Sequence, residues 1–328
     1  MPRWPWLLLG GLLLLAVLTG LGAGPFPLSP AEVIRLLLAG PGREGDAAVV
    51  VWSLRLPRVI AGLLVGAALA GAGAAYQAMF RNPLVSPDIL GVSAGAGLGA
   101  AFAILAGVEL LQVQALAFLG GLAAVGLVWM VAGWVRRHDP VLVLVLAGVA
   151  VGTLFSAGIA LAKVLADPSV QLPAITFWLL GGLQTVSPRD LVRAAPLIAA
   201  GLVPMFLLRW RVNLLTLADE EAATLGVNVP RLRLVMILSA TLITAASVAV
   251  AGIVGWVGLL VPHAARLLVG PEFSRLLPAS LLLGAAFLVA ADTLARSVAG
   301  IELPLGVLTA IVGAPAFLWL LARSDRPA

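Results

Sequence analysis

The amino-acid sequence alternates long uncharged runs with short polar breaks. One run, Val59–Phe80, follows two arginines that flank a proline, and it is long enough for a bilayer crossing, which takes about 20 apolar residues. The next residues, RNPLVSPD at 81–88, are polar and contain two prolines. Such a segment does not form a lipid-facing helix, so we expect it at an interface or inside the protein. A second uncharged, glycine-rich run follows, and the two runs predict a helical hairpin within a membrane.

The same alternation continues along the chain and predicts about ten membrane-spanning helices. A short surface helix capped by Ser29 is expected between the first two spans. After a break at 167–173, residues 173–188 are expected to form a short helix or a re-entrant piece. The nearly uncharged run 234–265 is too long for one helix, and its glycines favour a break after 251. The predicted spans are residues 4–31, 59–80, 89–108, 110–135, 140–163, 191–208, 234–251, 252–270, 277–296 and 305–322.

Composition supports an all-α polytopic membrane protein. Of the 328 residues, 62% are hydrophobic and 11% are charged, whereas soluble domains carry about 25% charged residues. We therefore expect residues 1–328 to form a single transmembrane domain with no sizeable soluble part. The chain has no cysteine, which excludes disulfides and thiolate chemistry. It also has no basic tail of the kind that predicts nucleic-acid binding.

The basic residues indicate an orientation. With both termini in the cytoplasm, ten spans place more of them inside than outside, as the positive-inside rule favours. Several outside arginines lie at the ends of spans, among them Arg55, Arg58 and Arg296. An acidic partner that docks on the outer face would explain these positions.

The sequence GVSAG at 91–95 fits the G-x-S-x-G nucleophile pattern, so an intramembrane serine hydrolase is one hypothesis. That chemistry needs a strained turn and a base, and the two histidines, His138 and His263, are predicted at the ends of spans. Close helix packing around Ser93 is the preferred interpretation, because small residues four apart recur along the chain. The pairs are Gly62/Gly66, Gly95/Gly99 and Gly148/Gly152.

Two polar residues within or beside apolar runs are interpreted as structural. A charge at the bilayer centre costs ~2.5–3.5 kcal/mol, so an ion pair of Asp292 with Arg296, one helical turn later, is preferred over a proton relay. His263 follows Pro262 and has no second ligand at metal-binding spacing. We therefore expect a capped or hydrogen-bonded histidine and no metal site.

The segment ADEEAATLG at 218–226 is the most informative polar stretch. Three acids at its start favour a helix N-terminus, and Gly226 favours a stop. A short cytoplasmic helix of this kind is either part of a solvated loop or a rigid knob that fits a cleft in a cytoplasmic partner.

Several motifs together resemble the FecCD family of permeases, the membrane subunits of binding-protein-dependent ABC importers for iron chelates, haem and cobalamin. The similarity extends over nearly the whole chain. The matching stretches are RLPR at 55–58, QAMFRNPLVSPDILGVSAGAG at 77–97, FWLLGGL at 177–183, LGVNV at 225–229, GWVGLLVPHAARLLVG at 255–270, LLPASLLLGA at 276–285, AD and AR within 291–296, and LPLGVLTAIVGAPAFLWLL at 303–321.

The resemblance implies a type II ABC importer permease that forms a homodimer in the inner membrane of a prokaryote. Two cytoplasmic ATPases bind below, and a substrate-loaded binding protein docks above through its acidic residues on Arg55, Arg58 and Arg296. A coupling helix within a loop at about 212–230 seats in the ATPase, and it comprises Leu217, Asp219, Glu220, Glu221, Ala222, Ala223, Leu225 and Gly226. The residues that carry the family motifs or packing are Arg81, Asn82, Pro83, Gly91, Ser93, Gly95, Pro262, His263 and Asp292.

The resemblance also implies alternating access driven by the separate ATPase, so that ATP and Mg²⁺ belong to the partner and this chain is no enzyme and holds no cofactor. No Walker-type sequence occurs in the chain. An iron chelate, either a siderophore complex or haem, is the expected cargo, with cobalamin as the alternative. Two hypotheses of another class stay open: the serine hydrolase, and an ion-coupled secondary transporter in which Asp292 is the only candidate relay.

Overall fold

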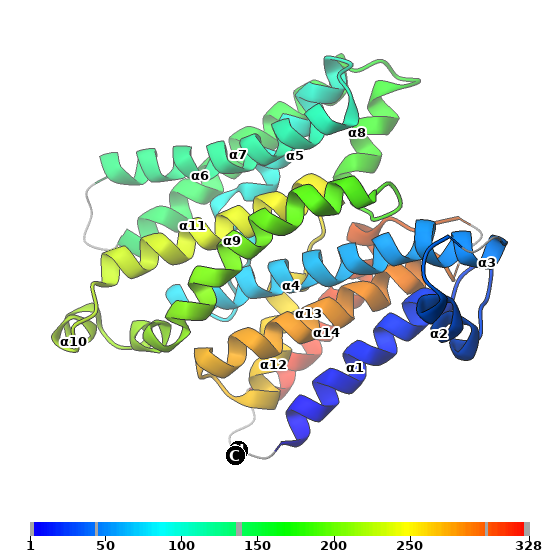
Figure 1. Ribbon diagram of the computed structural model, residues 1–328. Coiled ribbons are helices and arrows are strands. Elements are labelled where there is room, and N and C mark those ends of the chain that lie inside the picture. The colour runs from blue at the N-terminus through cyan, green and yellow to red at the C-terminus, as the bar shows by residue number, and fades with distance from the viewer. Residues whose placement is uncertain (1–2, 43–44, 136–139, 299–300, 325–328) are drawn as a thin grey trace.

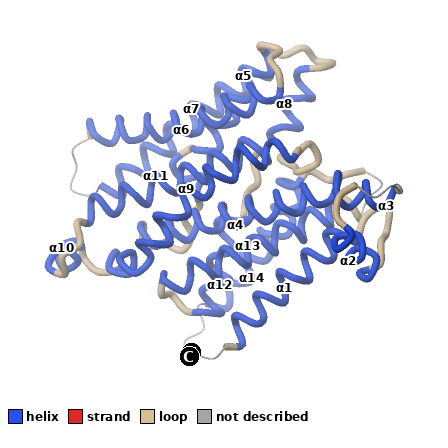
Figure 2. The backbone as a smooth tube through the Cα atoms, viewed as in Figure 1, coloured by secondary structure: helices blue, strands red, loops and turns tan. Residues whose placement is uncertain are grey.

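The computed structural model describes residues 3–42, 45–135, 140–298 and 301–324, and these ranges contain helices and loops but no strand (Figure 2). The helical elements are α1 (Trp4–Gly22), α2 (Pro30–Ala39), α3 (Asp46–Val49), the π-helical turn η1 (Val50–Arg55), α4 (Leu56–Met79), the 3₁₀ turn η2 (Pro87–Leu90), α5 (Val92–Leu105), α6 (Leu110–Trp134), α7 (Pro140–Leu165), α8 (Gln171–Leu180), α9 (Pro188–Val212), the 3₁₀ turn η3 (Asn213–Thr216), α10 (Asp219–Thr224), α11 (Val229–Ala251), α12 (Val257–Val269), α13 (Phe273–Ala295) and α14 (Leu305–Ser324).

Seven stretches of the described chain are long and apolar enough to cross a membrane. They comprise α1, α6, α7, α11 and α13 as single helices, the continuous helix Asp46–Met79, and α9 with its 3₁₀ extension. The shorter apolar helices α5, α12 and α14 lie where the other three spans were predicted, and α8 is the predicted short extra element. The all-helical polytopic fold is therefore confirmed.

Small residues allow the central helices to approach closely. Helix α4 lies against α9, α11, α12 and α13, while α5, α6 and α7 form a neighbouring group beyond α11 (Figure 1). A Cβ atom added at Gly66 would lie 2.2 Å from the carbonyl oxygen of Gly284, and one added at Gly95 would lie 2.3 Å from that of Gly120. The predicted packing role of these small residues is confirmed, because no larger residue fits there.

The chain order gives the bundle two distinct ends. Helix α13 begins where the backbone N–H of Phe273 donates to the side chain of Asn213, next to α10, and it ends at Arg296 beside the end of α1. We call these the α10 end and the arginine end. Helix α11 also runs from the α10 end to the arginine end. The backbone N–H of Leu305, at the start of α14, donates to the carbonyl oxygen of Gly181, which lies near the end of α11, so α14 starts at the arginine end. Therefore α1 begins and α14 finishes at the α10 end (Figure 1).

Several predicted boundaries were wrong. The second span does not start beside Arg55, because helix continues from Asp46 through the π-helical turn into α4. The third begins later than predicted, at Val92, after the 3₁₀ turn. Helix α9 extends beyond 191–208 to include terminal arginines, whose long side chains can carry their charge to the interface. Pro173 lies in the first turn of α8, where proline is tolerated, and not in the preceding break.

Candidate functional site

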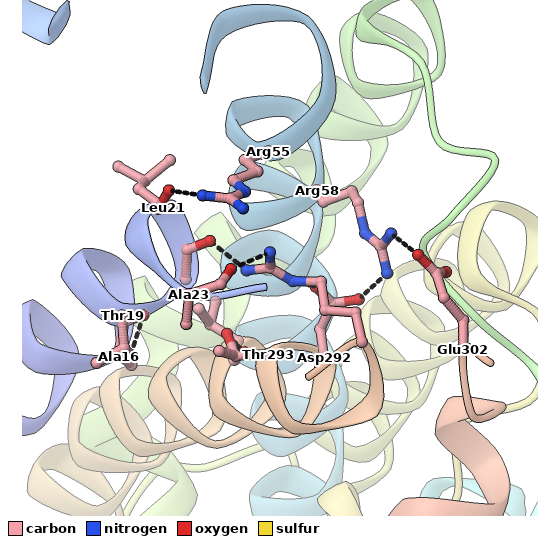
Figure 3. A network of polar contacts seen from close by, with 12 residues as sticks. Ala16, Thr19, Leu21, Ala23, Arg55, Arg58, Asp292, Thr293 and Glu302 are labelled. Carbon is pink, nitrogen blue, oxygen red and sulfur yellow. Dashed lines mark hydrogen bonds and ion pairs between the residues drawn. The ribbon is translucent and has the colours of Figure 1, made fainter. Parts of the chain in front are cut away.

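The arginine end contains a network of five charged side chains, which we call the arginine cluster: Arg55, Arg58, Arg296, Asp292 and Glu302 (Figure 3). The residues come from the π-helical turn, the first turn of α4, the end of α13 and the loop before α14. The predicted pair of Asp292 with Arg296 is confirmed, with 3.4 Å between the nearest oxygen and nitrogen. Sequence spacing could reveal this pair because it is an i, i+4 contact.

Two arginines of the cluster hold the end of α1. The guanidinium of Arg55 donates to the carbonyl oxygens of Leu21, Gly22 and Phe26 at 2.6–3.0 Å. That of Arg296 donates to the carbonyl oxygens of Ala23 at 2.6 Å and of Gly20. The last carbonyls of a helix lack partners within the helix and attract cations. These two side chains are 5% and 6% exposed in this single chain, so they are mainly occupied with the protein itself.

Arg58 is the most accessible of the three arginines. Its guanidinium donates to the carboxylate of Asp292 at 2.8 Å and to that of Glu302 at 2.9 Å. The side chain of Glu302 is 46% exposed, against 4% for Asp292. Sequence reasoning missed both contacts, because the partners are more than 200 residues apart along the chain. Arg58 thus lies between a buried carboxylate and one that solvent reaches.

The opposite end carries the predicted coupling helix. Helix α10 covers Asp219–Thr224, so the predicted helix start and the stop are confirmed, and Gly226 adopts a φ of 80° that favours glycine. Leu217 precedes the helix and Ala222 packs it against the bundle, whereas its other predicted members are exposed: Asp219, Glu220, Glu221, Ala223, Leu225 and Gly226. The helix therefore presents an acidic, exposed outer surface, and it projects from one end of the bundle (Figure 1).

Two arginines fix the first residue of this helix. Arg233 on α11 forms a bidentate pair with the carboxylate of Asp219 at 2.7 and 2.8 Å, and Arg81 lies 3.1 Å from the same group. Arg81 also donates to the carbonyl oxygens of Leu215 and Leu217. Its backbone has a φ of 47°, which is uncommon for a residue with a side chain and marks a conformation enforced by its surroundings. We call Asp219, Arg81 and Arg233 the α10 clamp.

The polar loop after α4 packs through glycine and does not assemble a hydrolase site. Gly91 has a φ of 75° and lies against Gly152 of α7. Ser93 donates its hydroxyl hydrogen to the carboxylate of Asp88, and none of the hydrogen bonds of the described residues joins it to a histidine. Asp88 is exposed, but the surrounding protein atoms displace part of the water that would hydrate its carboxylate. This desolvation raises the pKa of Asp88, and the hydrogen bond from Ser93 opposes the rise. His138 lies outside the described residues.

One prediction for α12 was wrong. His263 follows Pro262 within the helix and is 7% exposed, yet neither ring nitrogen has a hydrogen-bond partner. Its ring meets the edge of Phe317 on α14 instead. The expectation of a hydrogen bond failed because the proximity of an aromatic ring from a distant helix is invisible in the local sequence.

A family model described as the FecCD transport family matches residues 12–323. The chain belongs to this family. The family model describes transport proteins, so the serine hydrolase hypothesis for Ser93 is set aside.

Curated FecCD relatives carry different cargo names. The cobalamin import permease BtuC of Halobacterium salinarum is 45% identical over 89% of this chain and 79% of its own. The molybdate import permease MolB of Haemophilus influenzae is 38% identical over 97% of this chain and 96% of its own. A probable iron chelatin permease of Helicobacter pylori is 44% identical over 65% of this chain, which spans 64% of that relative's length. Sequence similarity alone therefore does not select a cargo.

Among solved structures, an inward-facing conformation of a putative metal-chelate type ABC transporter matches with a TM-score of 0.88 and 36% identity. The match covers 98% of this chain and all of the other. PsaBC of Streptococcus pneumoniae, at 18% identity and a TM-score of 0.57, shares the fold. The ABC permease architecture expected from the sequence is thus confirmed.

Proposed function

We propose that this FecCD chain is the permease subunit of a binding-protein-dependent ABC importer. One observation carries the proposal: the arginine cluster and the clamped acidic helix α10 lie at opposite ends of one helical bundle. A transporter that couples two partners across a membrane needs one docking surface on each side. The secondary-transporter alternative loses its only candidate relay, because Asp292 is held between two arginines.

At the α10 end, the proposed partner is a cytoplasmic ATPase that receives α10 in a cleft. The clamp supports this role, since it links α10 both to α11 and to the end of α4. Motion imposed on α10 is then transmitted along two central helices, which gives a physical route for alternating access. In this orientation both termini are cytoplasmic, and the membrane is the inner membrane of a prokaryote.

At the arginine end, the proposed partner is a substrate-binding protein whose carboxylates meet Arg58 first. Arg55 and Arg296 lie directly behind it and add positive potential while holding α1. Charge complementarity of this kind steers docking and sets orientation. Two copies of the permease would enclose the path, with the exposed apolar residues of α7 and α14 available for that contact.

For the cargo we propose an iron chelate, in line with the metal-chelate type neighbour and the iron chelatin relatives. Cobalamin is the second candidate, favoured by the 45% identity to a cobalamin permease. The test is purification of the tagged permease in mild detergent, identification of co-purifying proteins, and reconstitution of the complex into liposomes. ATP-dependent uptake of radiolabelled ferric siderophore, haem, cobalamin or molybdate names the cargo. Uptake by the permease alone, with no ATPase, would overturn the proposal.

A further inference from the structure

A cavity of about 510 Å³ lies at the α10 end of the bundle, where the end of α4 meets α12 and the start of α13. Its wall also includes the beginning of the loop after α4 and the segment that follows α9. No aspartate or glutamate belongs to this wall. The polar lining residues are Gln77, Arg81, Asn82, Asn213, Thr216, His263 and Arg266. The cavity is separate from the arginine cluster at the other end.

Among the described residues, Arg266 is a cation that forms no ion pair. Its only hydrogen bond among the described residues goes to the amide oxygen of Gln77, at 2.9 Å. The amide nitrogen of Gln77 donates to backbone carbonyls of α12, the nearer at 3.2 Å from Leu259, which fixes the orientation of that amide. A half-buried guanidinium therefore has donors left over and no carboxylate to neutralise its charge.

Two asparagines in the wall also present donors. The side-chain oxygen of Asn82 accepts from the backbone N–H of Leu84 at 2.9 Å, and that of Asn213 accepts from Phe273 at 2.6 Å. Their amide NH₂ groups are left unbonded within the described chain. Buried His263 adds two ring nitrogens that lack partners. A ligand with acceptor oxygens that enters the cavity would bond to the asparagine amides, and also to the His263 ring once that ring turns toward it.

We propose that this cavity binds the phosphate group of an anionic ligand, with Arg266 as the charged anchor and the two asparagine amides as neutral donors. A wall that offers donors and no carboxylate matches the acceptor-only oxygens of phosphate, and guanidinium pairs with them especially well. The ligand also touches the α10 clamp, because Arg81 belongs to both.

The phosphate can come from an anionic phospholipid or from solution. Leu267, which follows Arg266 and lines the cavity, is 61% exposed. An exposed leucine beside a basic cavity at a helix end suits a lipid, whose acyl chains would cover the leucine while its headgroup fills the cavity. A soluble phosphate gains nothing from this neighbour. The experiment must therefore separate the two sources.

The test uses the full chain, which has no native cysteine, with Leu267→Cys as a unique label at the cavity wall. Its rate of reaction with a soluble maleimide is measured in detergent with phosphatidylglycerol, phosphatidylcholine, inorganic phosphate or chloride at equal ionic strength. Phosphatidylglycerol is expected to slow labelling by at least about fivefold, as one charge contact of about 1 kcal/mol gives. Phosphatidylcholine is expected to change the rate by less than about twofold.

Charge variants in the same background identify the anchor. Arg266→Gln is expected to abolish protection, whereas Arg231→Gln, which removes an exposed charge near the same end but outside the cavity wall, is expected to preserve it. Equal protection by inorganic phosphate alone would support the site and assign a soluble ligand. The proposal is overturned if both lipids protect equally, if none of the ligands protects, or if Arg266→Gln keeps full protection. Should Arg266→Gln not fold, the ligand series on the intact cavity still decides.

Discussion

The arginine cluster and the cavity at the α10 end solve the same electrostatic problem in different ways. In the cluster, three guanidiniums share two carboxylates and five backbone carbonyls of the chain itself. In the cavity, Arg266 bonds to one amide oxygen and pairs with no carboxylate of the described chain. Both positions lie at the end of a membrane-spanning helix, where a charge can reach water. The charges of the cluster therefore have their partners within the single chain, whereas Arg266 in the cavity obtains an anionic partner only from a bound ligand.

The largest expected effect comes from removing the shared anion of the cluster. Asp292→Asn leaves two largely buried guanidiniums without their common carboxylate, and loss of one partner of a buried pair costs about 3–5 kcal/mol. The free energy of unfolding in detergent, measured by denaturant titration, should fall by that amount. The control is Arg275→Gln, which removes a partly exposed i, i+3 pair with Glu272 and should cost less than about 1 kcal/mol. Equal losses in the two variants would contradict a self-sufficient cluster.

The next largest effect is expected from Gly73→Ala, which tests whether the cavity depends on close packing of α4 with α12. A Cβ atom at Gly73 would lie 1.8 Å from the carbonyl oxygen of Gly258, so Gly73→Ala forces the helices apart and should destabilise the chain by about 1–3 kcal/mol. It should also reduce lipid protection at the cavity, because Gln77 and Arg266 lie on the two helices that separate. In Gly126→Ala the added atom meets nothing within 4 Å. That control should keep both stability and protection.

The α10 clamp is expected to matter more for coupling than for stability. Its pairs are partly exposed, so Asp219→Ala should change the free energy of unfolding by no more than about 1 kcal/mol. ATP-driven uptake in liposomes should nevertheless fall about tenfold, because α10 loses its fixed attachment to two helices. Glu220→Gln alters the charge of an exposed neighbour that makes no ion pair among the described residues. Uptake as low in this control as in Asp219→Ala would show that charge on α10, and not the clamp, is what the ATPase requires.

The smallest effect concerns Glu302, the exposed partner of Arg58. A docking carboxylate must compete with Glu302 for the same guanidinium, so Glu302→Gln should tighten the permease's affinity for its binding protein. Since an exposed pair is worth at most about 1 kcal/mol, the gain should not exceed about fivefold. Titration of the purified complex at several salt concentrations measures it, with Glu220→Gln, an exposed carboxylate at the opposite end of the bundle, as the control. Weaker binding would mean that Glu302 itself contacts the partner.

Local patterns predicted the elements well and their boundaries less well. Ser29, which accepts from the backbone N–H of Glu32, caps α2 as expected, and Asp219 and Gly226 bound α10 as expected. These signals act within one helical turn, so the sequence contains them. The continuation of helix through Asp46–Arg55 was missed, because a polar start and a π-helical turn break the apolar pattern without breaking the helix.

Patterns along the sequence were enough to predict the membrane solvent, the helical class and the one ion pair that lies along a single helix. The motifs of the sequence also identified the family. Which polar groups meet became visible only in the folded chain: Arg58 with Asp292 and Glu302, Asp219 with Arg233 and Arg81, and Arg266 with Gln77 as its one hydrogen-bond partner among the described residues. The physical reason is range. Burial and helix periodicity are written locally along the chain, whereas the neutralisation of a charge depends on helices that the fold brings together from distant positions.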